Sequence, residues 1–152
     1  MAECVILVGL PGAGKTTFYR QRFAATHRLI SKDEWPNARN RDARQAQALR
    51  DALSAGMSVV VDNTNPTVAD RASIIAIALS HGARIVGYFF DVATRDAVAR
   101  NAARTGRGKV PNVAIFTIAK RLTPPATAEG FDALFRVSVT RDEGFTVEPL
   151  GA

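Results

Sequence analysis

The N-terminal part of the chain contains a glycine-rich pattern that is typical of phosphate binding. The pattern G-x-x-x-x-G-K-[ST] is matched in full by Gly9-Leu-Pro-Gly-Ala-Gly14-Lys15-Thr16. Its glycines let backbone N–H groups turn toward phosphate oxygens, at a helix N-terminus that already favours negative charge. Lys15 can reach the β- and γ-phosphates, and the hydroxyl of Thr16 is the expected Mg²⁺ ligand. The predicted nucleotide-binding residues of this loop are Gly9, Pro11, Gly12, Ala13, Gly14, Lys15, Thr16 and Thr17.

Two aspartates follow short apolar runs, and each could act on the group that accepts the phosphate. Asp33 follows residues 28–31, which we interpret as a strand, so it should lie at the carboxyl edge of a sheet, where doubly wound folds bind ligands. A kinase needs a carboxylate near the acceptor hydroxyl, although Asp33 could also be a loop or cap residue. Asp62 ends the run 59–61 and resembles the acidic residue of a second nucleotidase motif, or else it caps the turn that follows.

The arginines concentrate in residues 39–50 and 95–107, and two such clusters could line one anionic groove. Arg100 and Arg104 lie four residues apart on a predicted helix, hence on one face, where like charges destabilise a helix by a few tenths of a kcal/mol. A bound polyphosphate would explain them. Together with Arg107 they predict a lid over residues 100–111; a solvated basic helix face is the alternative.

Apolar runs alternate with helical patterns along the chain, and this alternation implies a mostly parallel sheet covered on both faces. Buried strands are predicted at Cys4–Val8, Arg28–Ser31, Val59–Val61, Ile85–Phe90 and Phe135–Val139. Helices are predicted at Thr16–Phe23, Asp42–Ala55, Pro66–Ser80 and Thr94–Arg104. Residues 105–111 and 122–130 are predicted loops because they are rich in glycine and proline.

Composition limits the class of protein. With 152 residues, the chain is expected to form a single domain over residues 1–152. One cysteine, Cys4, excludes a disulfide framework, and no apolar run is long enough to span a membrane. The N-terminus has no basic region, so we expect no signal peptide and a cytoplasmic protein. Asn-Lys-x-Asp, the guanine-reading motif of GTPases, is absent, and the chain is too short for a two-domain ring ATPase, which leaves a small kinase.

Several segments together resemble the kinase domain of polynucleotide 5′-kinases. These segments are Gly9–Thr17, Asp33, Asp62-Asn-Thr-Asn-Pro66 with Arg71, Arg100-Asn-x-x-Arg104, Val110-Pro111, Lys120-Arg121 and Pro125-Ala-Thr-Ala-Glu129-Gly130-Phe131. The resemblance covers nearly the whole chain in the right order. It implies an adenylate-kinase-like P-loop NTPase fold of class α/β, with about five parallel strands and a small lid. It also implies ATP and Mg²⁺ as cofactors.

The resemblance further assigns roles at the site. Asp33 would be the general base, and Arg104, with Arg100, would bind the polyphosphate; the implied catalytic residues are Lys15, Asp33 and Arg104. Where the family has an arginine three residues after the aspartate, this chain has Pro36, so other cations must hold the acceptor. The acceptor candidates are Trp35, Arg39, Arg41, Asp62 and Asn63.

Three functions are consistent with these patterns. The first is a kinase that moves the γ-phosphate of ATP to the 5′-hydroxyl of RNA or DNA, without an attached phosphatase or ligase module and without an obligate protein partner. The second is a kinase of a small metabolite or antibiotic on the same scaffold. The third is an ATP-binding regulator that has no acceptor.

Overall fold

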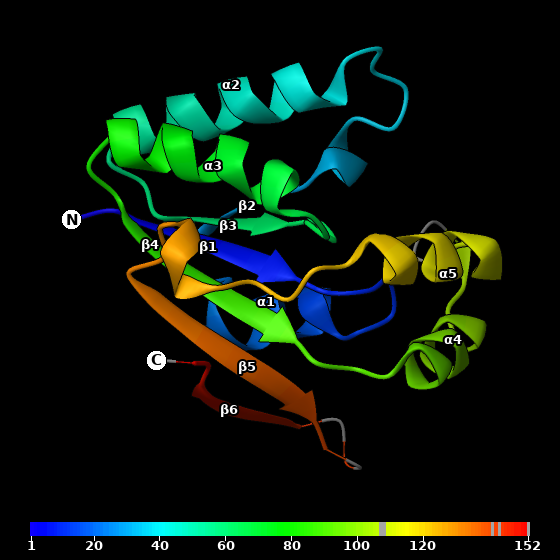
Figure 1. Cartoon of the computed structure of the whole chain (residues 1–152). Helices are drawn as coiled ribbons and strands as arrows, with labels where there is room; N and C mark the ends of the chain where they lie inside the picture. The colour runs from blue at the N-terminus through cyan, green and yellow to red at the C-terminus, as the bar shows by residue number, and fades with distance from the viewer. Residues whose placement is uncertain (107–108, 141, 143, 152) are drawn as a thin grey trace.

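The computed structural model describes residues 1–106, 109–140, 142 and 144–151, and it is an α/β domain (Figure 1). The strands are β1 (Glu3–Val8), β2 (Arg28–Ile30), β3 (Val59–Asp62), β4 (Arg84–Phe90), β5 (Ala133–Val139) and β6 (Phe145–Pro149). The helices are α1 (Lys15–Arg22), α2 (Arg41–Ser54), α3 (Val68–Ser80), α4 (Thr94–Ala102) and α5 (Asn112–Arg121), with 3₁₀ turns η1 (Lys32–Glu34) and η3 (Thr127–Glu129).

The described strands form one sheet in the order β2-β3-β1-β4-β5-β6. The first five strands are parallel, and β6 runs antiparallel to β5. After β1 the chain crosses to β2 on one side, whereas after the neighbouring β3 it crosses to β4 on the other side. Such a reversal leaves a crevice at the carboxyl ends of two adjacent strands, which is where open α/β sheets bind ligands. The loop after β1 and the turn after β3 therefore meet at the expected binding edge.

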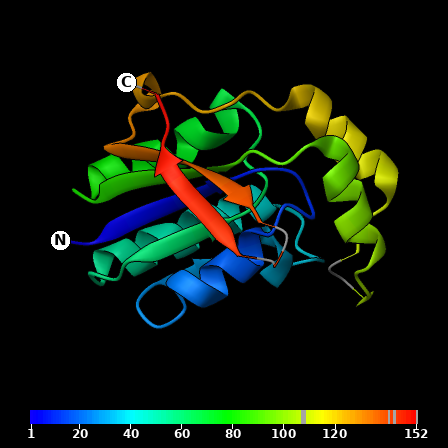
Figure 2. The ribbon, with the colours of Figure 1, turned by 90° about the horizontal axis from the view of Figure 1, so that it is seen from below.

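The two faces of the sheet pack against different helices, which explains the continuous apolar runs of the central strands. On β1, Cys4 and Ile6 pack in the cluster that includes α2 and α3, whereas Val5 and Leu7 pack with Phe18 of α1. Figure 1 shows α2 and α3 on one side of the sheet, and Figure 2 shows α1 and β6 on the other. Helices α4 and α5 lie beyond the carboxyl ends of the strands (Figure 1).

The predicted fold class is confirmed, and the helices α1, α2 and α3 begin and end within two residues of their predicted bounds. Two elements escaped prediction. The helix α5 has exposed apolar residues and only one buried one, Ile115, so its hydrophobic pattern is ambiguous. The strand β6 is a short edge strand with no fully buried residue, and it extends the expected five strands.

The prediction that Arg100 and Arg104 share one helix is wrong. Helix α4 ends at Ala102, because the next two backbone N–H groups bond three residues back, to the carbonyls of Arg100 and Asn101. The buried Asn101 side chain then holds the backbone of Val110, donating to its carbonyl at 2.6 Å and accepting from its N–H at 2.9 Å. Arg104 therefore belongs to the connection between α4 and α5.

Candidate active site

The loop between β1 and α1 depends on glycine at two positions. Gly12 and Gly14 have φ values of +83° and +98°, which L-residues rarely adopt. A Cβ atom on Gly12 would also lie 2.6 Å from the carbonyl oxygen of Ala97 in α4. Gly14 is the N-cap of α1, so the loop presents a helix N-terminus to its interior.

Lys15 lies inside this loop, with 7% of the residue exposed. Its Nζ donates hydrogen bonds to the carbonyls of Gly9 at 2.8 Å and Leu10 at 2.7 Å. Burial lowers the pKa of Lys15 to about 8, the Asp62 carboxylate opposes this shift, and the Arg104 cation adds to it. The ammonium group is therefore fixed beside the phosphate-binding backbone, and any bound anion would stabilise its charge.

Thr16 connects the loop to the end of β3. Its hydroxyl donates a 2.8 Å hydrogen bond to Oδ2 of Asp62. Burial raises the pKa of Asp62, while the Lys15 charge and the Thr16 hydrogen bond act in the opposite direction. Two adjacent oxygen donors suit Mg²⁺, which binds through few protein oxygens together with substrate phosphates. No cluster of three or more His, Cys, Asp or Glu residues occurs in the described ranges.

The turn after β3 is hydrogen-bonded to β1 and to the loop that follows it. Gly9 N–H donates to the Thr64 carbonyl at 3.0 Å, and Asn65 Nδ2 donates to the Leu7 carbonyl at 2.8 Å. Asn65 has φ of +45°, a conformation that asparagine adopts more readily than most residues. Asn63 Oδ1 accepts from the N–H of Lys32 at 3.0 Å, so the same turn also holds η1.

A buried ion pair holds this turn from behind. Arg71 of α3 is fully buried and donates to Glu129 through Nε at 2.7 Å and Nη2 at 3.0 Å. Its Nη1 donates to the carbonyl of Asn65 at 3.0 Å. The sequence resemblance included Arg71 and Glu129 but gave them no role. The contacts make them positioning residues for the turn.

Asp33 lies at the exposed rim of this edge, in the turn η1. Its side chain is 96% exposed, and Oδ1 lies 3.5 Å from Nη2 of Arg41. Its negative charge raises the pKa of both Lys15 and Asp62, which places it within electrostatic reach of the loop. Arg41 also donates from Nε to the Lys32 carbonyl at 3.1 Å, so it is anchored on the same turn.

The two lid arginines both approach the loop. Arg100 Nε donates to the carbonyl of Gly12 at 2.9 Å. The positive charge of Arg104 lowers the pKa of Lys15 and of Asp62, so its guanidinium acts at the same site although it lies outside the helix. Arg107, also expected in the lid, lies outside the described residues.

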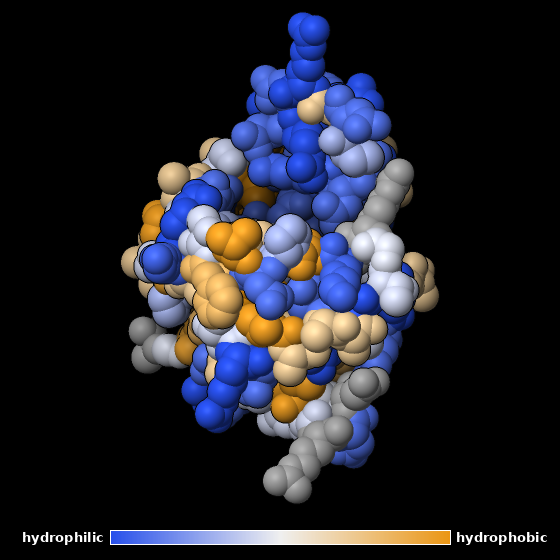
Figure 3. Space-filling model, turned by 90° about the vertical axis from the view of Figure 1, so that its right-hand side faces the viewer, coloured by the Kyte–Doolittle hydropathy of each residue, from blue (hydrophilic) through white to orange (hydrophobic). Residues whose placement is uncertain are grey.

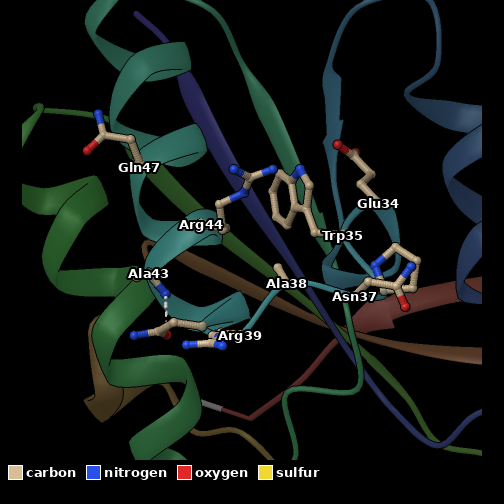
Figure 4. Close-up of a pocket in the computed structure, with 10 residues that line it drawn as sticks. Glu34, Trp35, Asn37, Ala38, Arg39, Ala43, Arg44 and Gln47 are labelled. Carbon is tan, nitrogen blue, oxygen red and sulfur yellow. Dashed lines mark hydrogen bonds between the residues drawn. The ribbon is translucent and has the colours of Figure 1, made fainter.

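Apart from Arg41, which contacts η1 beside Asp33, the acceptor candidates divide into two groups. Trp35 and Arg39 line a cavity of about 640 Å³ beside the N-terminal half of α2, together with Arg44 (Figure 4). The other group, Asp62 and Asn63, lies at the loop and under η1 instead. In Figure 3 the face at the carboxyl ends of the strands is hydrophilic at the top, where the segment leading into α2 lies, and hollowed below it. Arg44 belongs to the arginine cluster 39–50 that the sequence singled out, but the sequence did not name it as an acceptor residue.

These features define the chain as a P-loop kinase: a parallel sheet, a phosphate-binding loop at its switch point and a lysine within that loop. A family profile described as an AAA domain matches residues 4–125, and the chain belongs to this family. No helix in the described ranges has the length and apolar character needed to cross a bilayer.

Known relatives include kinases of different acceptors. The bifunctional polynucleotide phosphatase/kinase of Schizosaccharomyces pombe is 28% identical over 133 residues, 85% of this chain and 32% of that protein. The chain spans about a third of the length of the curated relatives it matches. A fungal RNA kinase structure has a TM-score of 0.65 at 17% identity, covering 94% of this chain and 78% of its own. A sugar kinase from Janibacter sp. HTCC2649 has a TM-score of 0.67 at 13% identity, covering 91% and 86%. These structural likenesses show the fold alone.

Lys15→Ala is expected to weaken binding of a non-hydrolysable ATP analogue and to lower phosphate transfer about a hundredfold or more. The reason is that the variant removes the one cation held inside the described part of the loop. Calorimetric titration with the analogue measures binding, and Arg20→Ala, an exposed cation on the same helix, is the control. Wild-type affinity and turnover in Lys15→Ala would show that the loop is not the active site.

Proposed function

We propose that this chain transfers the γ-phosphate of ATP to the 5′-hydroxyl of a polynucleotide. The observation that carries the proposal is the position of Asp33: an exposed carboxylate at the binding edge, in electrostatic reach of Lys15 and Asp62. The sequence similarity to a polynucleotide phosphatase/kinase supports the choice of acceptor. An exposed general base suits the 5′ end of a polynucleotide, because the strand can approach the Asp33 carboxylate from solvent.

The residues on the donor side would hold and neutralise ATP. Lys15, Arg100 and Arg104 would bind the phosphate oxygens, whose negative charge is redistributed as the γ-phosphoryl group moves. Thr16 and Asp62 would hold Mg²⁺ through their oxygens. When bound, Mg²⁺ supplies positive charge to the β- and γ-oxygens.

The nucleoside part of ATP has a separate candidate pocket. A cavity of about 360 Å³ lies between the end of β4, the first turn of α4 and the end of β5. Arg100 lines it and also donates to Gly12 of the loop, so the cavity adjoins the phosphate site. Ser138 and Thr140 supply polar groups along its other wall. We assign this pocket to the base and sugar of the nucleotide.

The residues on the acceptor side would prepare the hydroxyl. Asp33 accepts the hydroxyl proton as the oxygen bonds to the γ-phosphorus and the bond from that phosphorus to the bridging oxygen of ADP breaks. Arg41, whose Nη2 lies 3.5 Å from Oδ1 of Asp33, orients the carboxylate. The reaction therefore needs no group beyond those at this edge, ATP and the metal.

A small-molecule kinase is the second candidate. The cavity of about 640 Å³ beside Asp33 is of the size that holds a small ligand, and a sugar kinase shares the fold. The third candidate is an ATP-binding regulator, which would transfer no phosphate.

Radiolabelled ATP offered to 5′-hydroxyl oligonucleotides and to a panel of small alcohols separates these functions. Labelled oligonucleotide is the expected product. Label on small alcohols alone would overturn the proposed acceptor, and no transfer to either, with ATP bound, would favour the regulator.

Asp33→Asn is expected to lower kcat about 10²- to 10⁴-fold with nucleotide affinity nearly unchanged. The variant keeps the shape of the side chain but removes the proton acceptor, and the exposed carboxylate makes no contact with the loop. Steady-state kinetics and analogue titration provide the two measurements. Asp142→Asn, at an exposed site before β6, is the matched control. An unchanged kcat in Asp33→Asn would assign the base to another residue.

Arg39→Gln is expected to raise the acceptor KM and to flatten its salt dependence by about 0.7 in log–log slope, the value for one phosphate contact on a single strand. In the double variant with Arg41→Gln, kcat should fall as well, because Arg41 also orients Asp33. The KM for each oligonucleotide is measured at several salt concentrations. Arg50→Gln, an exposed cation on the same helix, serves as the control. Identical salt slopes for Arg39→Gln and wild type would place the strand elsewhere.

A further inference from the structure

The cavity beside α2 is lined by the residues that follow the proposed general base in the chain. Trp35 forms its wall and is two residues after Asp33, so their Cα atoms are at most about 7 Å apart. The Trp35 N–H donates to the Lys32 carbonyl at 3.1 Å, which closes the turn that carries Asp33. The wall of the cavity therefore begins within two residues of the proposed general base.

The cavity has an aromatic surface of fixed position. The Trp35 ring is half-buried and packs against the core beneath α2 and α3. The guanidinium carbon of Arg44 lies 5.8 Å from the centre of this ring, and Figure 4 shows the Arg44 side chain reaching toward Trp35 from α2. A tryptophan and a guanidinium are the groups on which nucleobases stack in single-strand binding proteins.

Polar groups of the cavity suit the remainder of a nucleotide. Asn37 and Gln47 carry amides that can both donate and accept hydrogen bonds, as the edge of a base requires. Arg39 lines the same cavity and has no carboxylate partner among the residues that the structure describes. A cation in this position suits a phosphate. A neutral sugar could use the amides and pack on the tryptophan, but it would leave the Arg39 cation without an anion.

We propose that this cavity binds the base of the 5′-terminal nucleotide of the acceptor strand. The base stacks on Trp35 and Arg44, and Arg39 binds the phosphate on the 3′ side of that nucleotide. The inference rests on the proposed function, because it assumes a polynucleotide acceptor. It adds a recognition step: the enzyme holds the end of the strand by its last base, which brings the 5′-hydroxyl to Asp33.

Trp35 itself is the probe for this proposal, since the chain has a single tryptophan. Two 5′-hydroxyl oligonucleotides are compared that differ only in the first nucleotide, which is either normal or abasic, so every phosphate is kept. The normal strand should quench Trp35 fluorescence, and the abasic strand should not. Loss of one stacked base should raise the acceptor KM roughly 5- to 150-fold.

Three variants test which residues cause the difference in KM between the normal and the abasic strand. Arg44→Gln should raise the KM for the normal strand and reduce the difference between the two strands, with the KM for ATP unchanged. Trp35→Leu should abolish the difference, and Arg44→Gln keeps the test valid if Trp35→Leu folds poorly. Arg50→Gln, exposed on α2 but outside the cavity lining, should behave as wild type.

The outcomes separate the two proposals. Equal KM values for the normal and abasic strands, both phosphorylated and neither quenching Trp35, would overturn the base pocket while leaving the kinase function intact. Failure to phosphorylate any oligonucleotide, with transfer to a small alcohol that quenches Trp35, would overturn both and assign the cavity to that alcohol. Preference for the normal strand that disappears in Arg44→Gln supports the proposal.

Discussion

The site depends on an ion pair, Arg71 with Glu129, that lies behind the turn after β3. Arg71 and Glu129 lie in the core behind the sheet edge, and an uncompensated charge there would cost about 3–5 kcal/mol. Two nitrogens of Arg71, Nε and Nη2, bond to Glu129, and this fixes the orientation of the planar guanidinium group. Its third nitrogen, Nη1, therefore points at the carbonyl of Asn65 and donates to it. The Asn65 side chain then bonds to the end of β1, so one rigid network connects the core to the loop.

This network brings opposite charges together at one edge. The turn after β3 supplies Asp62 to the loop through Thr16, and its next residue, Asn63, holds the turn that carries Asp33. Lys15 is therefore within electrostatic reach of two carboxylates, Asp62 and Asp33, and both raise its pKa against the effect of burial. The donor and acceptor halves of the proposed reaction are thus positioned by adjacent residues of one turn.

Local patterns predicted the fold well for two reasons. The central strands are buried on both faces, so their sequences are continuous apolar runs, and the motif Gly9–Thr16 is typical of one loop conformation between a strand and a helix. Local patterns failed where contacts between residues far apart in the sequence determine where an element begins or ends. The end of α4 is set by Asn101 holding Val110, which no helical periodicity reveals, and α5 shows an apolar pattern that is mostly exposed. Trp35 and Arg39 were predicted as acceptor residues, but their cavity depends on Arg44, whose approach to the Trp35 ring follows from how α2 packs.

The central claim is that the turn after β3 holds the phosphate-binding loop in place, and amide hydrogen exchange in Asn65→Gly tests it most directly. Glycine keeps the positive φ and the bond from Arg71 to the carbonyl of residue 65, and it removes only the side-chain bond to Leu7. We predict that exchange at the Gly9 amide, which bonds to Thr64, accelerates about tenfold or more relative to the Asp132 amide, which bonds to Ile85 away from the loop. Equal acceleration at both amides, or none at Gly9, would contradict the account.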